Sequence, residues 1–269
     1  MEVMREQHSE APDRTEAPTA PGVGTAIVIP AFNEAATIGA IVRTCLGLPG
    51  SPRVIVVDDG SADATAAEAA AAGARVLPCQ RNGGKGAALR AGMRAALAEG
   101  VGFIVTLDAD GQHDPADMPR LLAAARPDRV VIGARTPSPD TPPARLVANH
   151  VADFWVSWAA RQRVTDSQSG FRVYPARLAV QVAGGVAPAE RFAFESEALI
   201  EAGRRGFRTV AVPIASCYPA GARASHFRPV VDIARIVGMV AGKLLPRAMD
   251  PVGLWHALRP GLPPDAPGR

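Results

Sequence analysis

The sequence predicts an α/β fold in which an open, mostly parallel sheet is flanked by helices. Short apolar runs alternate with longer stretches of helical character along most of this 269-residue chain. Most of the runs are bounded by Gly, Pro or Asp, which is typical of strands buried in a parallel sheet. Strands that alternate with helices in this way form βαβ units, and these build an open sheet.

Five strands are expected, at residues 26–30, 54–57, 104–107, 129–132 and 209–212. The expected helices cover residues 35–48, 62–72, 85–98, 115–125, 145–160 and 191–204. Gly73 and Gly100 follow two of these helices, where a glycine commonly ends the last turn. Pro115 stands where a helix can begin. Residues 136–143 hold four prolines and are expected to form an extended surface loop.

Composition divides the chain into four parts. Residues 1–22 and 257–269 are polar and rich in proline, so both are expected to be disordered tails. Residues 23–228 are expected to form one α/β domain, which is long enough to bury a core without disulfides. Residues 229–256 are expected to form a C-terminal amphipathic helical segment.

Charge and cysteine content exclude several classes of protein. The formal net charge is only +3 and the basic residues are scattered, so no nucleic acid partner is expected. Cys45, Cys79 and Cys217 are far apart, which excludes a disulfide framework and favours a reducing, cytoplasmic location. No signal peptide and no membrane span is expected.

Acidic residues follow three of the predicted strands, at the edge of the sheet where ligands bind in such folds. Asp108 and Asp110 are two residues apart, a spacing that points both carboxylates to the same side of an extended chain. Carboxylates that lie close together favour a divalent cation such as Mg²⁺ or Mn²⁺, and Gln112 would add an amide oxygen. A solvated turn is the alternative interpretation, since Asp and Gly are also turn residues.

Two further segments at this edge have two interpretations each. Asp58 and Asp59 precede a predicted helix, where one acid would serve as a cap and the other would be free to bind a ribose or base. Lys85 belongs to the glycine-rich segment 82–86, which either contacts phosphates or forms a tight turn before a helix. That segment lacks Walker spacing, and no GxGxxG follows the first strand, which counts against a dinucleotide enzyme.

Six stretches carry a resemblance to a known family. They are IVIPAFNE (27–34), VVDDGS (56–61), GKGAALR (84–90), TLDADGQHDP (106–115), DSQSGFR (166–172) and FESE (194–197). The first four resemble the family 2 glycosyltransferases, which have the GT-A fold and bind nucleotide sugars. The last two are similar to the dolichol-phosphate mannosyltransferase-like branch, which transfers sugars to dolichyl or polyprenyl phosphate. The resemblance runs from about residue 25 to residue 235.

The resemblance implies roles for individual residues. Those that match donor-binding positions are Pro30, Phe32, Glu34, Val57, Asp59, Lys85, Asp108, Ala109 and Arg135. Asp110 and Gln112 match the pair that holds the metal, and Arg145 is a candidate for the acceptor phosphate. His226 occupies a position where the branch has a lysine, and Arg223 is a candidate replacement for an arginine that is missing near Pro219.

The resemblance implies an inverting transfer of a hexose from a UDP- or GDP-sugar to polyprenyl phosphate at a membrane surface. A lipid phosphate is already anionic near neutral pH, whereas a hydroxyl acceptor needs a general base, for which Glu195 and Glu197 are the candidates. Transfer to a saccharide, a noncatalytic nucleotide-sugar-binding module and a nucleotidyltransferase remain alternatives. A polar helix face is the other interpretation of the two glutamates.

Membrane contact is expected from the C-terminal segment. Apolar residues recur at helical spacing within 230–240, and Arg228, Arg235, Lys243 and Arg247 lie nearby. An apolar face with basic residues at its border is typical of helices that lie on an anionic membrane. A helix that packs against the core would show the same pattern, so the sequence leaves both interpretations open.

Overall fold

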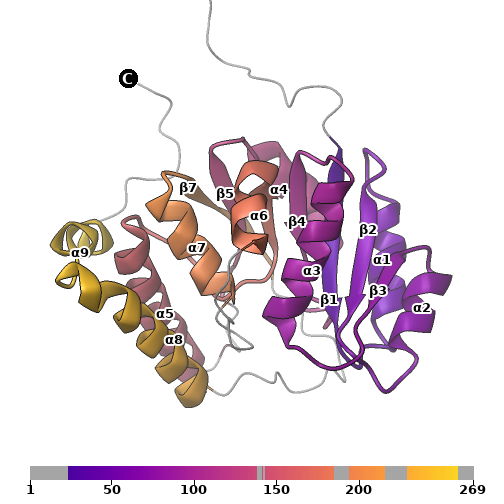
Figure 1. The fold of residues 1–269 in the computed structure, drawn as a ribbon, viewed down its shortest axis with the longest axis horizontal. Helices are drawn as coiled ribbons and strands as arrows, with labels where there is room; N and C mark the ends of the chain where they lie inside the picture. Colours follow the sequence, from indigo (N-terminus) through magenta and orange to yellow (C-terminus); the bar gives the residue numbers. More distant parts are fainter. Residues whose placement is uncertain (1–23, 138–140, 142, 185–193, 216–228, 260–269) are drawn as a thin grey trace, which may run out of the picture.

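The computed structural model describes residues 24–137, 141, 143–184, 194–215 and 229–259. In these ranges seven strands form one sheet in the order β3-β2-β1-β4-β6-β5-β7 (Figure 1). The strands are β1 (Thr25–Ala31), β2 (Arg53–Asp58), β3 (Arg75–Pro78), β4 (Phe103–Thr106), β5 (Arg129–Arg135), β6 (Arg172–Pro175) and β7 (Arg208–Ile214).

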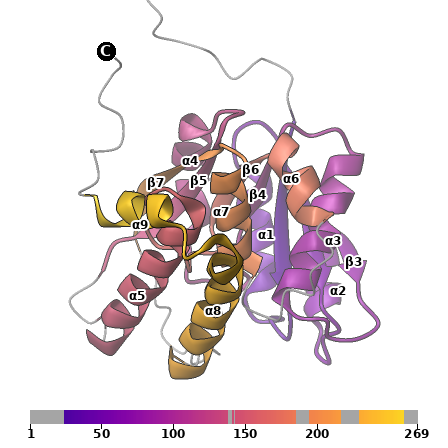
Figure 2. The ribbon, with the colours of Figure 1, turned by 60° about the vertical axis from the view of Figure 1, so that its left-hand side comes forward.

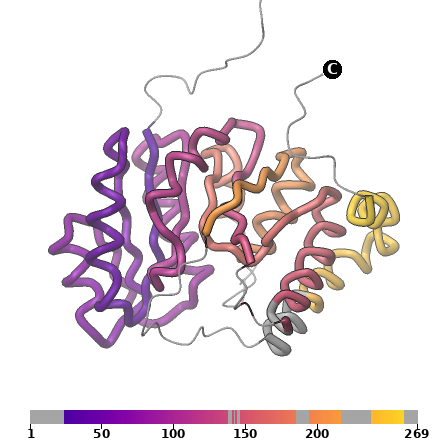
Figure 3. Tube along the Cα trace, turned by 180° about the vertical axis from the view of Figure 1, so that it is seen from behind, coloured from indigo at the N-terminus to yellow at the C-terminus, as the bar shows by residue number. Residues whose placement is uncertain are grey.

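Helices cover both faces of the sheet. One face carries α1 (Ile38–Leu46), α2 (Thr65–Ala71) and α4 (Met118–Ala124), and the other carries α3 (Lys85–Ala98), α6 (Ala176–Ala183) and α7 (Phe194–Arg204). Beyond β7, α5 (Pro143–Ala160), α8 (Pro229–Leu244) and α9 (Pro251–Leu258) pack together at one end of the molecule (Figures 2 and 3). The result is a three-layer α/β/α domain with a helical cluster at one end.

Alternation along the strands explains the two layers of core. In β1, Ala26 and Val28 point into the core under α3, while Ile27 and Ile29 point into the core under α1. All four side chains are fully buried. A strand with apolar residues on both faces must be covered on both faces, which is why the run reads as continuously apolar in the sequence.

The structure confirms the predicted fold class and the five predicted strands, with small shifts at their ends. It adds two strands that the sequence analysis missed. The first, β3, is a four-residue edge strand whose side chains are half-buried or exposed, so it lacks a clear apolar pattern. The second, β6, runs antiparallel to β4 and β5, and it begins with the charged residue Arg172.

The predicted helices are also present, with corrections. Gly73 and Gly100 have φ of 101° and 70°, as expected for glycines that end a helix. The expected helix at 115–125 is split into a short 3-10 helix (Pro115–Asp117) and α4. The predicted disordered tail at 257–269 begins too early, because α9 extends to Leu258; the remaining predicted tails lie outside the described residues.

Close packing of α3 against the sheet depends on Gly92. A Cβ atom added there would lie 2.3 Å from Cγ1 of Val28 and 3.0 Å from Cγ2 of Val57. Both of these valines are fully buried, so neither has room to move. The absence of a side chain at Gly92 therefore sets how closely α3 approaches β1 and β2.

Gly92→Ala is expected to lower the free energy of unfolding by roughly 1–3 kcal/mol, since overpacking outweighs the gain in helix propensity. Gly238→Ala is the matched control, because Gly238 is exposed in α8 and its Cβ would meet no atom within 4 Å. That variant is expected to gain up to about 1 kcal/mol. Urea denaturation of both variants makes the comparison, and equal stabilisation of the two would contradict it.

Candidate active site

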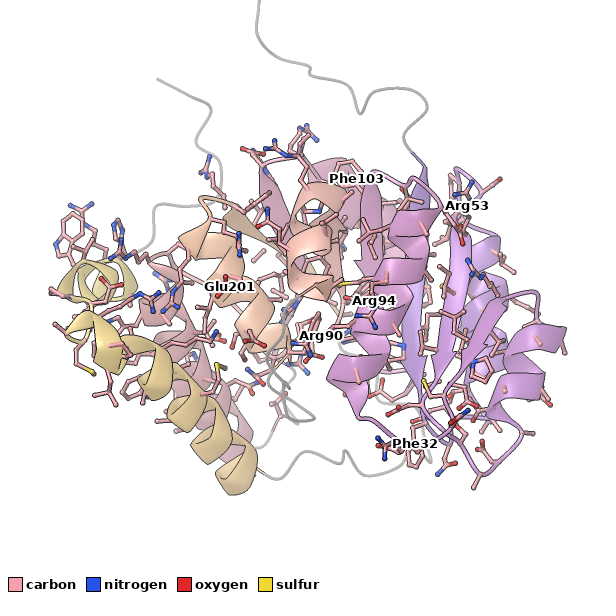
Figure 4. The ribbon with its side chains drawn as sticks, in the orientation of Figure 1. Phe32, Arg53, Arg90, Arg94, Phe103 and Glu201 are labelled. Carbon is pink, nitrogen blue, oxygen red and sulfur yellow. The ribbon has the colours of Figure 1, made fainter. Side chains whose placement is uncertain are left out.

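The carboxyl ends of β1, β2 and β4 meet at one edge of the sheet, because the three strands are parallel. Side chains from the segments that follow them gather at this edge, where the exposed ring of Phe32 also lies (Figure 4). The sequence predicted this juxtaposition from the acidic strand ends. The structure adds that residues from β5, the segment before β6 and α7 reach the same place.

A lysine bridges two carboxylates at the centre of this site. The Nζ atom of Lys85 lies 2.7 Å from Oδ1 of Asp108 and 2.6 Å from Oε1 of Glu195. Lys85 is the first residue of α3, Asp108 follows β4, and Glu195 stands in the first turn of α7. The ion pairs therefore join two halves of the chain that are far apart in sequence.

Burial and charge act in opposite directions on this cluster. Burial lowers the pKa of Lys85, but Asp108 and Glu195 outweigh it and hold that pKa above its ordinary value. Burial raises the pKa of Asp108, yet Lys85 and then His113 outweigh it and hold the carboxyl below its usual range. Both groups are consequently charged at neutral pH, as their ion pair requires.

Asp59 fixes the loop that presents Lys85. Its two carboxylate oxygens accept hydrogen bonds from the backbone N–H groups of Gly83 and Gly84, each at 2.8 Å. Its neighbour Asp58 accepts from the backbone N–H of Ser61 at 3.1 Å in the turn after β2. The predicted cap is wrong, because α2 begins only at Thr65 and its N-cap residue, Ala64, makes no side-chain hydrogen bond. The ribose contact of Asp59 stays a prediction, and the observed contacts give this residue a role in positioning the glycine-rich segment.

Asp110 and Gln112 lie next to this cluster in a tight turn. Oδ1 of Asp110 accepts a hydrogen bond from the backbone N–H of Gln112 at 3.0 Å. Burial, and then the charge of Asp108, raises the pKa of Asp110 above its ordinary value. No group of three His, Cys, Asp or Glu side chains in the described ranges is arranged to hold a metal ion.

A hard divalent cation nevertheless fits the donor set. Two carboxylates and an amide oxygen are ligands that Mg²⁺ and Mn²⁺ accept, and such ions complete their coordination with substrate phosphates. The mutual repulsion of Asp108 and Asp110 is the cost that a bound cation would remove. The residues present therefore fit the predicted metal.

His113 was treated as part of a motif and given no role by the sequence analysis. It is buried, its ring lies 5.7 Å from that of Phe171, and burial lowers its pKa. Its Nδ1 atom has no hydrogen-bond partner within the described structure. Its position directly after Gln112 was the available sequence signal that it would lie at the site.

Arg135 is held in place by Asp166, and the backbone at Asp166 is held in turn by Asp153. Its Nε and Nη2 atoms donate to Oδ2 and Oδ1 of Asp166 at 2.9 and 2.7 Å, and its backbone N–H also donates to Asp166. Asp153 in α5 accepts in turn from the backbone N–H groups of Asp166 and Ser167. A bidentate pair of this kind fixes the plane of the guanidinium, which suits a residue predicted to contact phosphate.

The segment 166–172 supports the residues of the site. Arg172 is fully buried, and its guanidinium donates to the carbonyl oxygens of Ser167, Ser169 and Glu195. Gly170 lies against Asp108, where an added Cβ would be 2.4 Å from Oδ2. The motif that indicated the branch is therefore a structural support for Asp108, Glu195 and Arg135.

The loop after β1 is tied to the neighbouring loops. The backbone N–H of Asn33 donates to Ser61, that of Glu34 donates to Thr65, and Thr37 donates to the carbonyl of Ala109. Pro30, Val57 and Ala109 are buried, whereas the ring of Phe32 is 43% exposed. Among these predicted donor-binding residues, Phe32 offers the exposed apolar surface.

Several predicted residues lie elsewhere or outside the described part. Glu197 faces away from Lys85 and pairs with Arg90 of α3 and Lys243 of α8, at 3.2 and 3.1 Å. Figure 4 places Arg90 on the side of α3 that faces α7. Arg145 belongs to α5, but its side chain is outside the described structure, as are Arg223 and His226.

Comparison with known proteins identifies the family. The model of glycosyl transferase family 2 matches residues 26–179, which include β1 to β6 and all of the acidic strand ends. The chain belongs to this family. The assignment makes it a glycosyltransferase.

Relatives give the assignment more detail. An uncharacterised protein of Methanocaldococcus jannaschii is 31% identical over 81% of this chain and 89% of its own length. An undecaprenyl-phosphate mannosyltransferase of Micrococcus luteus is 30% identical over 70% of this chain and 81% of its own. A polyprenol monophosphomannose synthase of Mycolicibacterium smegmatis is 30% identical over 71% and 76%.

Solved structures support the fold. Glucosyl-3-phosphoglycerate synthase of Mycobacterium tuberculosis, crystallised with Mn²⁺, uridine diphosphate and glucosyl-3-phosphoglycerate, has a TM-score of 0.62. It is 24% identical to this glycosyltransferase and covers 86% of the chain and 81% of its own. At this identity the likeness supports the GT-A fold and carries no conclusion about the substrate.

Gly170→Ala is expected to lower glycosyl transfer roughly a hundredfold. The added methyl group would lie 2.4 Å from Oδ2 of Asp108 and displace that carboxylate from its ion pair with Lys85, so the unfolding midpoint should fall as well. Steady-state kinetics and thermal unfolding separate the two effects. Gly24→Ala is the control, because its nearest neighbour would lie at 3.8 Å; equal activity of the two variants would contradict the role of Gly170.

Asp166→Asn is expected to cost roughly 2–4 kcal/mol of stability at pH 7, since it breaks a buried bidentate pair. Burial raises the pKa of Asp166, but Arg135 outweighs it and holds that pKa below its usual range. A depressed pKa stabilises the fold above the unfolded value of about 4, and that stabilisation is lost as pH falls through the folded pKa.

Urea denaturation between pH 7 and about pH 2.5 makes the test, because the loss falls mainly below the unfolded pKa of about 4. The stability difference between wild type and the Asp166→Asn variant should be constant down to about pH 5 and narrow below it. Asp128→Asn removes an exposed pair with Arg129 and should change stability little at any pH in this range. A difference that widened towards acid pH would contradict the assigned sign.

Proposed function

We propose that this family 2 glycosyltransferase moves a hexose from a UDP- or GDP-sugar to polyprenyl phosphate, with inversion at the anomeric carbon. Two relatives at 30% identity are named for polyprenyl or undecaprenyl phosphate, and each is matched over three quarters or more of its own length. The choice of a phosphate acceptor over a hydroxyl acceptor is supported mainly by the contacts of the two candidate bases, Glu195 and Glu197.

Both glutamates that a hydroxyl acceptor would need are engaged in ion pairs. Glu195 contacts Lys85 at 2.6 Å, and Glu197 contacts Arg90 and Lys243. A carboxylate whose oxygens are directed at cations is not placed to take a proton from an acceptor hydroxyl, because a general base must lie within hydrogen-bond reach of that proton. An acceptor that is already anionic needs no such base, and a phosphate monoester meets this condition.

In the proposed reaction the bond from the anomeric carbon to the donor diphosphate breaks, and its electron pair leaves on the diphosphate oxygen. An oxygen of the acceptor phosphate forms the new bond from the opposite face, and no proton has to move. Lys85 and Arg135 would hold the anionic groups in line, since both side chains are fixed by carboxylates. Arg145 is a further candidate for the acceptor phosphate.

Asp108, Asp110 and Gln112 would hold Mg²⁺ or Mn²⁺, which neutralises charge on the leaving diphosphate when it is bound. Pro30, Phe32, Glu34, Val57, Asp59 and Ala109 would contact the nucleotide. His226 would approach the diphosphate from the segment that precedes α8. Mn²⁺ in a solved structural neighbour supports the choice of a divalent cation.

The proposed acceptor also implies a place at the membrane. None of the helices in the described ranges has the length and apolar character of a membrane crossing. Relatives named for membrane-linked polyprenyl phosphates support peripheral association. We therefore expect the enzyme on the cytoplasmic face of the membrane.

The test is a lipid assay with the purified protein, polyprenyl phosphate, Mg²⁺ or Mn²⁺, and pooled UDP- and GDP-sugars. Mass spectrometry of the lipid extract should show a polyprenyl-phosphate hexose that disappears when a chelator is added. Asp110→Asn should lower its yield roughly a hundredfold, since one ligand of the charge-neutralising ion is lost. Asp128→Asn should leave the yield unchanged, because Asp128 is exposed and directly precedes the first residue of β5.

Release of nucleoside diphosphate without a lipid product would contradict the acceptor and leave the family assignment intact. The next substrates would then be saccharides and small phosphorylated acceptors, with Glu195 and Glu197 as the residues to substitute. Full turnover of lipid in the presence of chelator would contradict the metal site instead. The two outcomes are separate because the lipid product tests the acceptor and the effect of the chelator tests the metal.

A further inference from the structure

The C-terminal corner of the molecule exposes an apolar surface that the active site does not use. Five of the ten large apolar side chains that are exposed in the described ranges lie between residues 245 and 258. We define the α9 patch as these five side chains: Leu245, Met249, Val252, Trp255 and Leu258. They belong to α9 and to the short turn that joins it to α8.

The patch is one face of a helix that is apolar on both faces. Val252, Trp255 and Leu258 are spaced by three residues, so they lie on one side of α9. The other side packs against α5, where Gly253 is buried and Leu254 and Ala257 contact the core. A surface helix normally has a polar outer face, and an apolar outer face indicates a missing partner.

The position of α9 is fixed, so the exposure of the patch is a property of the fold. Nε1 of Trp158 donates to the carbonyl oxygens of Met249 and Asp250, both at 3.0 Å. Arg161 donates to both carboxylate oxygens of Asp250, and Asp250 also caps the start of α9 at Gly253. Figures 1, 2 and 3 all show α9 at the end of the molecule that lies beyond β7.

The charges around the patch are of one sign at the surface. Arg247 and Arg259 are exposed at its borders, and the Arg259 guanidinium lies 3.4 Å from the centre of the Trp255 ring. Asp250 is the acid of this segment, and it is buried and paired with Arg161. A half-exposed tryptophan with arginines beside it is suited to the boundary between water and anionic headgroups.

We infer that the α9 patch docks the enzyme on the surface of an anionic lipid bilayer. This inference rests on the proposed polyprenyl phosphate acceptor, which requires the protein to work at a membrane. Of the α8 side chains that the structure describes, Val240 and Leu244 are buried and Lys243 pairs with Glu197. The α9 patch is therefore the described part of the C-terminal segment that we assign to this contact.

Co-sedimentation of the full-length protein with phosphatidylcholine vesicles, with and without phosphatidylglycerol, tests the inference. Wild type should bind the anionic vesicles, and a triple variant with Val252, Trp255 and Leu258 each changed to Ser should bind at least about tenfold more weakly. Val180→Ser is the matched control, because Val180 is exposed on α6 at a distance from α9. Thermal unfolding should be nearly unchanged in both variants.

A second pair of variants tests the charges. Arg247→Gln combined with Arg259→Gln should weaken binding to anionic vesicles roughly twentyfold, about fivefold for each arginine, and high salt should remove the difference. Arg53→Gln combined with Arg75→Gln is the control, since these arginines are also exposed and lie on β2 and β3 at the opposite end of the sheet. Equal weakening in the two pairs would overturn the assignment of the surface.

Three results would overturn the inference: wild type that ignores anionic vesicles, a triple variant that binds as wild type does, or a wild-type dimer in solution that the triple variant dissociates. The last would make the patch an interface between two copies. Transfer to a short-chain prenyl phosphate in solution separates this inference from the proposed function. Vesicle binding without transfer to any lipid acceptor refutes the function alone, and transfer without vesicle binding refutes the docking surface alone.

Discussion

The ion pairs of Lys85 with Asp108 and Glu195 are the interaction on which the site depends. They join the start of α3 and the end of β4 to α7 by contacts of 2.7 and 2.6 Å. Charges in a partly buried site need partners that are fixed, because an ill-placed partner leaves the cost of burial uncompensated. The surrounding structure supplies that fixation from several directions.

Each member of the cluster has its own support. Asp59 holds the glycine-rich loop before Lys85, and Arg172 holds the backbone at Glu195. Gly170 leaves the space that the Asp108 carboxylate occupies. A site built in this way is already organised before a donor binds, so binding energy is not consumed in ordering its groups.

Arg135 is fixed by contacts that reach the helical end of the molecule. Its guanidinium is oriented by Asp166, whose backbone is held by Asp153 of α5, and α5 packs against α8 and α9. One helix therefore contacts both the support of Arg135 and the helices that present the α9 patch. The active site and the proposed membrane contact are parts of one packed unit.

The sequence by itself determined the fold class, the carboxyl-edge position of the site and the family. Those features are local: β-branched runs with acidic ends, such as 104–110, specify both a buried strand and the polar residues that follow it. The sequence analysis did not separate capping from ligand binding at Asp59, nor a catalytic base from a structural anion at Glu195 and Glu197.

Only the tertiary structure shows the contacts of these residues, because their partners are distant in the chain. Asp59 meets Gly83 and Gly84 about 25 residues away, and Glu197 meets Arg90 across 107 residues. The antiparallel strand β6 is a similar case. It lies between β4 and β5 in the sheet, and its four residues alone do not predict that position. The outer face of α9 is the same case: its residues are apolar all round, and only the packing of Gly253 against Trp158 determines which side remains exposed.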